Sequence, residues 1–214
     1  MQQHHNKRIQ DFWHQLELTI DQLLTSRQDN QFDADSLLSE YRDTLQKIDE
    51  NLTFHFERDE DDGPVEMIFG CDGYPESIHS VLSLVGAAPD LSGIRFTAFN
   101  HRYDPIPRFI NVADEVCELS DYWYSLSSIE NKLHLAIYMH DVSFMLDMDP
   151  RVEAVMIFLD ALIGEYELMT RVWSLDWIEL PPDPVDYSLR PLSELREGFD
   201  ELKHAISPIG ITIH

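Results

Sequence analysis

The sequence is poor in the residues that build common cofactor sites. It has two cysteines, Cys71 and Cys117, which form no CxxC pair and are too few for a disulfide scaffold or a four-sulfur zinc site. Its eight glycines form neither GxGxxG nor GxxxxGK[ST], so we expect no glycine loop that cradles phosphates. The GxSxG pattern of hydrolytic serines is also missing. We therefore expect no cofactor and no metal.

Basic residues and long apolar runs are scarce too. There are 15 lysines and arginines against 40 acids, which gives a formal net charge of −25. Nucleic-acid binding needs a basic surface, and so does docking on an anionic membrane, so we expect neither partner. No segment approaches the roughly 20 apolar residues that span a bilayer. These absences, with two unpaired thiols, predict a cytoplasmic protein.

Apolar residues make up 43% of the chain, which is enough for a folded core. Residues 1–50 predict an N-terminal helical hairpin packed on the main domain, because apolar residues recur there at helical spacing. The stripes of its two helices are Ile9, Phe12, Trp13, Leu16, Ile20, Leu23 and Leu24, then Leu37, Leu38, Tyr41, Leu45 and Ile48.

Residues 51–214 predict an α+β domain with two strand–strand–helix–strand units. The apolar period changes to two at LTFHFE (52–57), and KLHLAIYMH (132–140) alternates most clearly. Asp149 and Pro150 predict the start of a helix that Gly164 ends. We expect a mixed, largely antiparallel sheet of about five to seven strands with helices on one face.

An acidic run lies between the first two expected strands, at Glu57, Asp59, Glu60, Asp61 and Asp62. Clustered carboxylates can bind calcium, but the spacing does not fit an EF-hand loop. A solvated hairpin turn is the favoured interpretation. With Glu165, Tyr166 and Glu167, these residues are the expected contacts for a basic protein partner.

One face of the expected sheet is polar, and five of its residues could form a catalytic site: His55, Glu66, Arg95, His134 and Tyr138. Left uncovered, they would suit a small hydrolase that uses histidine and carboxylate groups. A solvated or covered sheet face is the alternative. His134 and His140 are about 20 Å apart on one strand, so they cannot share a metal.

Two further patterns stand out near the second helix–strand pair. Asp160 and Glu165 lie near a helix C-terminus, where the dipole disfavours negative charge, and this conflict suits either a functional point or an exposed loop. Trp173, Leu175 and Trp177 alternate on one expected strand face. Such a face is typical of a core or an interface, so a homodimer is an open alternative.

Several segments resemble an uncharacterised family of bacterial proteins. They are Phe12-Trp13 in a helix, the strand LTFHFE, the segment AAPDLSGIRFTAF and the segment FLDALIGEYELM. The resemblance covers most of residues 9–180 and implies a stand-alone cytoplasmic α+β domain, with no activity attached. The sequence thus favours an acidic interaction or regulatory protein, similar to an immunity protein or inhibitor, over an enzyme. The hydrolase stays the alternative.

Overall fold

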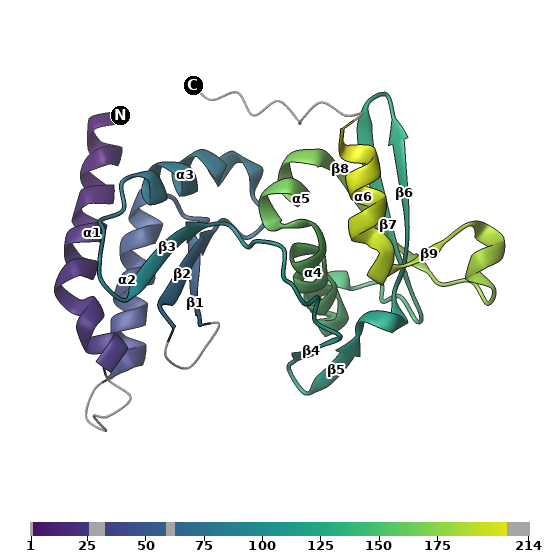
Figure 1. Cartoon of the computed structure of the whole chain (residues 1–214), viewed down its shortest axis with the longest axis horizontal. Helices are drawn as coiled ribbons and strands as arrows, with labels where there is room; N and C mark the ends of the chain where they lie inside the picture. Colours follow the sequence, from purple (N-terminus) through teal and green to yellow (C-terminus); the bar gives the residue numbers. More distant parts are fainter. Residues whose placement is uncertain (1, 26–32, 59–62, 205–214) are drawn as a thin grey trace. The chain divides into compact units, whose positions relative to one another are not determined.

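The computed structural model describes residues 2–25, 33–58 and 63–204. The chain divides into two compact units, residues 1–99 and 100–214 (Figure 1). The helical pair, expected to form a region of its own over residues 1–50, lies within the first unit. No helix among the described residues is both long enough and apolar enough to cross a membrane.

The first unit combines a helical pair with a small mixed sheet. Strands β1 and β2 are antiparallel, whereas β2 and β3 are parallel. The elements in chain order are α1 (Gln2–Thr25), α2 (Ala34–Ile48), β1 (Thr53–Glu57), β2 (Val65–Gly70), η2 (Pro75–Ser77), α3 (Ile78–Gly86) and β3 (Ile94–Ala98).

Aromatic side chains join the helical pair to this sheet. The ring of Phe12 on α1 contacts Tyr41 on α2 and Phe69 on β2, with centroids 6.3 and 5.8 Å apart. Trp13 packs on Phe96 of β3 at 4.7 Å, and its Nε1 donates to the Leu84 carbonyl of α3. The apolar stripe predicted for the first helix is therefore the surface that covers the sheet.

Over its described residues, 100–204, the second unit has more strands than the first, with the helices α4, α5 and α6. Its main sheet has the order β8-β7-β6-β9, in which β7 and β8 are parallel, and β4 and β5 form a separate antiparallel pair. The elements are β4 (Phe109–Val112), β5 (Glu115–Glu118), η3 (Leu119–Asp121), β6 (Trp123–Ile129), β7 (Lys132–Met139), η4 (Leu146–Met148), α4 (Pro150–Ile163), α5 (Glu165–Arg171), β8 (Val172–Glu179), η5 (Pro184–Tyr187), β9 (Arg190–Pro191), η6 (Leu192–Glu194) and α6 (Leu195–Lys203).

The core of this unit lies between one face of the main sheet and the helices α4 and α6 (Figure 1). Leu133 and Ile137 of β7 are fully buried, as are Phe158 of α4 and Phe199 of α6. The strict alternation of β7 explains this face, because every second side chain points into the core. Asp149 caps α4 as predicted, since its carboxylate accepts from the Arg151 amide.

The predicted fold class is confirmed: the described residues form an α+β structure with mixed sheets and an N-terminal helical pair. The strands form sheets of three, two and four strands rather than one sheet. Residues Glu165–Arg171 form a second short helix, α5, directly after the end of α4. Gly164, with φ +88°, ends α4 and turns the chain so that this second helix can begin.

Candidate functional site

The candidate hydrolase residues of the first unit lie on one face of its sheet, as predicted. Glu57 of β1, Glu66 of β2 and Arg95 of β3 are register partners, and His55 lies two residues from Glu57 on the same strand. Their contacts stay local. His55 Nε2 is 3.4 Å from Glu57 Oε1, and the Thr97 hydroxyl donates to the Glu66 carboxylate.

His134 and Tyr138 belong to the other unit. Both lie on the face of β7 that points away from the helix-covered core. His134 Nδ1 is 2.8 Å from the Ser174 hydroxyl, and the Tyr138 hydroxyl is 3.4 Å from that of Ser125. The five candidate hydrolase residues are therefore divided between two sheets, one in each unit.

A β-bulge changes the expected tryptophan face. The register between β7 and β8 shifts at Leu133 and His134, so that Val172 lies opposite Leu133 and Ser174 opposite His134. Leu175 and Trp177 pack against the core, but Trp173 is 51% exposed and lies under the Lys132 ammonium, 3.3 Å from the ring centroid. The extra residue breaks the alternation that would have put both tryptophans on one face.

The acidic contacts expected for a basic partner have different environments. Asp59, Glu60, Asp61 and Asp62 lie outside the described residues, and Glu57 faces His55. Tyr166 is 41% exposed. Glu167 forms an ion pair with Arg171, whereas Glu165 is buried. Glu165 is therefore not placed to contact a partner from an exposed surface.

Glu165 and Asp160 share a partner at the junction of α4 and α5. The Asn100 amide N–H donates to Glu165 Oε2 at 3.0 Å, and the Asn100 side chain donates to Asp160 Oδ2 at 3.3 Å. Burial is the main cause that raises the pKa of Asp160 to about 7; the Glu165 charge acts in the same direction, and the Asn100 hydrogen bond opposes both. The local conflict seen in the sequence is thus a pair of carboxyl groups within the fold, Glu165 buried and Asp160 half-buried, and not an exposed loop.

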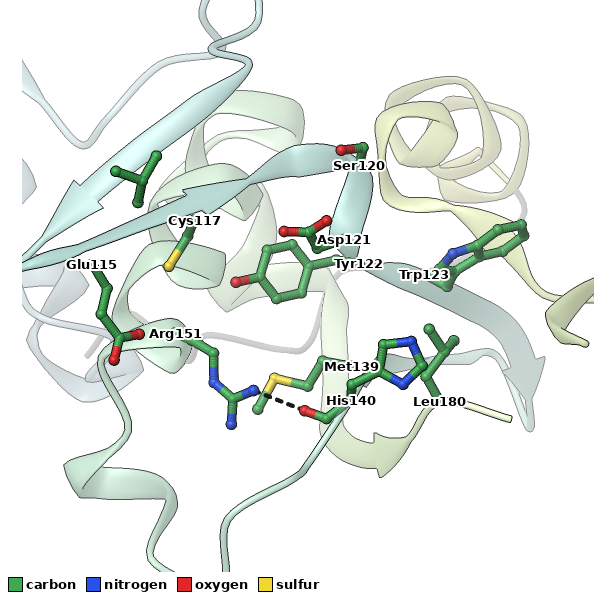
Figure 2. Close-up of a pocket in the computed structure, with 11 residues that line it drawn as sticks. Glu115, Cys117, Ser120, Asp121, Tyr122, Trp123, Met139, His140, Arg151 and Leu180 are labelled. Atoms are coloured by element: carbon green, nitrogen blue, oxygen red, sulfur yellow. Dashed lines mark hydrogen bonds between the residues drawn. The ribbon is translucent and has the colours of Figure 1, made fainter. Parts of the chain in front are cut away.

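A cavity of about 350 Å³ lies at the edge of the second unit, where β5, η3, the end of β7 and the start of α4 meet (Figure 2). Its lining combines aromatic and sulfur-containing side chains with charged ones. The apolar and aromatic residues are Val116, Cys117, Tyr122, Trp123, Met139 and Leu180, and the polar ones are Glu115, Ser120, Asp121, His140 and Arg151.

The buried part of the lining is formed by Tyr122, Cys117, Met139 and Leu180. Figure 2 shows the Tyr122 hydroxyl directed toward the Cys117 thiol, and the two groups share a hydrogen bond. Burial raises the pKa of Tyr122 far above its ordinary value, and the Cys117 contact adds to the rise. The phenol is therefore a neutral part of the lining at physiological pH.

Arg151 lines the cavity but is held by other bonds. Its guanidinium donates to the Asp149 carboxylate at 2.9 and 2.6 Å, and to the carbonyl oxygens of His140 and Asp141 at 2.8 Å each. Asp149 compensates its charge and raises its pKa. Arg151 thus joins the start of α4 to the end of β7.

The loop that follows His140 has a fixed base and an exposed apolar tip. Glu179 accepts from the Asp141 and Val142 amides at 2.9 Å each, and these bonds lower its pKa. Beyond this base, Phe144 is fully exposed, and Met145 and Met148 are 64% and 77% exposed. Apolar side chains grouped in this way on a surface are typical of contact sites.

The cavity and the exposed loop were not predicted from the sequence. The cavity residues come from β5, η3, the start of β6, the end of β7, the start of α4 and the residue after β8, and only the fold brings them together. The segment FMLDM at residues 144–148 could have indicated the exposed apolar loop, since large apolar residues lie there between predicted elements. Among the described residues, no group of three histidine, cysteine or acidic side chains is placed to hold a metal.

No protein-family model, no curated protein and no solved structure matches this chain, so the family suggested by its sequence stays a prediction.

Proposed function

We propose that this protein is a non-enzymatic binding protein for a basic protein partner. The observation that carries the proposal is that most of its lysine and arginine side chains are bound within the chain, whereas many acids are exposed. In the described part of the second unit, every arginine and lysine except Arg108 has a partner within the chain. Five of these cations form ion pairs with acids, and the remaining exposed acids of this described part have no cation to compensate their charge.

The acids gather near the cavity. Asp114, Glu115, Glu118 and Asp121 are all exposed, and they follow one another along β5 and the turns at its two ends. We call these four residues the acidic rim. Val116, 65% exposed, lies among them. Such a surface attracts a basic partner over a distance, and apolar contacts then slow its release.

Binding to an arginine-rich peptide should therefore be strong and salt-dependent. We expect the Kd, measured by calorimetry, to rise at least about tenfold between about 50 and 500 mM NaCl, because salt screens the exposed acids. A glutamate-rich peptide of the same length should not bind. Binding that does not change with salt, or no binding, would contradict the proposal.

The acidic rim should matter more than total charge. In the rim variant D114N/E115Q/E118Q/D121N, we expect the peptide Kd to rise about tenfold or more, which is about 1.4 kcal/mol of binding energy. A matched variant, D183N/D186N/E197Q/E201Q, loses the same charge at exposed positions outside the rim and should stay within about threefold of the original. Equal losses in both variants would show that no local surface is responsible.

A further inference from the structure

We infer that the cavity at β5, η3 and α4 receives an arginine side chain of the basic partner, a step that rests on the proposed function. The cavity holds about 350 Å³, at the small end of ligand pockets, which suits one side chain better than a large molecule. Its mouth is bordered by acids, and its wall is aromatic.

The charges around the cavity favour a cation. Glu115 and Asp121 are both exposed carboxylates of the lining, and Ser120 lies next to Asp121. The opposing charge of Arg151 is compensated by Asp149, so the lining with its neighbour carries a net negative charge. An anionic ligand would meet two carboxylates and compete with Asp149 for the one guanidinium.

The shape of the lining favours arginine in particular. Figure 2 shows Glu115 and Arg151 at one end, Trp123 and Leu180 at the other, and Tyr122 with Asp121 between them. A guanidinium can bond carboxylates in its plane and stack on aromatic rings, while its aliphatic stem contacts apolar atoms. Trp123, which is half-buried, and Val116, which is exposed, supply the accessible ring and apolar atoms, and Tyr122 and Met139 form the buried part of the wall.

The same unit already places its own cations on aromatic rings. Lys132 lies 3.3 Å from the centroid of Trp173, and Arg190 lies 5.8 Å from that of Tyr124. Trp123 comes directly before Tyr124, and its ring contributes to the cavity wall. A partner arginine on this wall would repeat a contact that the chain makes internally.

A small probe tests the cavity without any partner protein. N-acetyl-arginine methylamide, added to the full chain, should shift the NMR signals of the Trp123 indole and the Met139 methyl group and saturate in the millimolar range. Its neutral isostere, N-acetyl-citrulline methylamide, should shift neither, because citrulline lacks the charge. Equal shifts with both probes, or shifts with acetate instead, would overturn the inference.

Paired variants separate the cavity from the rim as a whole. We expect E115Q/D121N to weaken the arginine probe at least about fivefold, and D114N/E118Q, on the same hairpin but outside the lining, to leave it within about twofold. If the arginine probe does not shift the signals of Trp123 and Met139, while the arginine-rich peptide still binds with salt dependence, the cavity inference fails and the proposed function stands. If the probe binds and the peptide does not, the proposed partner class fails instead.

Discussion

Replacing Arg196 with glutamine should lower the free energy of unfolding by about 2–4 kcal/mol. The Arg196 guanidinium donates to the carbonyl oxygens of Tyr103, Ala161 and Leu162, at 2.6, 2.8 and 3.1 Å. Two of these carbonyls belong to the last turn of α4, where the helix itself offers no donors. Charge-assisted bonds of this kind are worth more than neutral ones, and a positive charge also favours a helix C-terminus.

The neighbouring contacts show why the loss would not be repaired. Arg102 is the other arginine at this helix end, but its Nε donates to the Ile163 carbonyl and its two terminal nitrogens donate to Asp200. It is therefore not available to take over the bonds of Arg196. A shorter glutamine can replace one of the three bonds at most, so the charge-assisted part of the connection is lost, while the Tyr103 amide still donates to the Ala161 carbonyl.

The measurement is urea unfolding followed by tryptophan fluorescence. Arg108 provides the control, since it is an exposed arginine of the same unit with no side-chain partner among the described residues. We expect R108Q to change the unfolding free energy by less than about 0.5 kcal/mol. A change below about 1 kcal/mol in R196Q would mean that water satisfies these carbonyls.

Replacing Asp160 with asparagine should stabilise the protein at pH 8 and leave it nearly unchanged at pH 4. In the folded state the pKa of Asp160 is about 7, whereas its ordinary value is 3.8. Between these values the folded protein holds a proton that the unfolded chain has lost, so stability falls as pH rises from about 4 to about 7. Above pH 7 the Asp160 carboxylate is charged, and the protein is then destabilised by the full cost of removing that charge from water.

The difference between the two pKa values corresponds to a loss of at most about 4 kcal/mol in the free energy of unfolding when Asp160 becomes charged. We therefore expect the free energy of unfolding of D160N to be higher than that of the original protein by about 2–4 kcal/mol at pH 8, and by less than about 1 kcal/mol at pH 4. The control D176N changes an exposed acid, and we expect it to change the free energy of unfolding by less than about 0.5 kcal/mol at pH 8. A carboxyl ¹³C titration that places Asp160 near pH 4 would contradict the explanation.

Local sequence patterns were sufficient for most of the secondary structure. The alternation of Leu133, Leu135 and Ile137 predicted β7 and its buried face, and Asp149 with Pro150 predicted the start of α4. These signals depend only on neighbours along the chain, and burial reinforces them. The helical stripe with Phe12 and Trp13 belongs to the same class, because its period alone identifies the face that packs.

Features that depend on distant pairing were not predictable in the same way. Asn100 and Asp160 are far apart in sequence, and nothing local indicates that an amide would meet that carboxyl. The bulge beside Val172 moves Trp173 out of the alternating pattern, yet it depends on how β7 and β8 align. The division into separate sheets has the same origin, since sequence patterns identify strands but not their neighbours.

The position of Arg151 links the selectivity of the cavity to the stability of the fold. Asp149, which also caps α4, and the carbonyl oxygens of His140 and Asp141 engage four of the five N–H groups of this guanidinium, so an anion could bind it with two hydrogen bonds only by breaking at least one native bond. Any affinity gained for the anion would be reduced by the free energy of those native bonds. A cation needs none of them broken. The cost of breaking native bonds therefore adds to the repulsion from Glu115 and Asp121, and both disfavour an anion in the cavity.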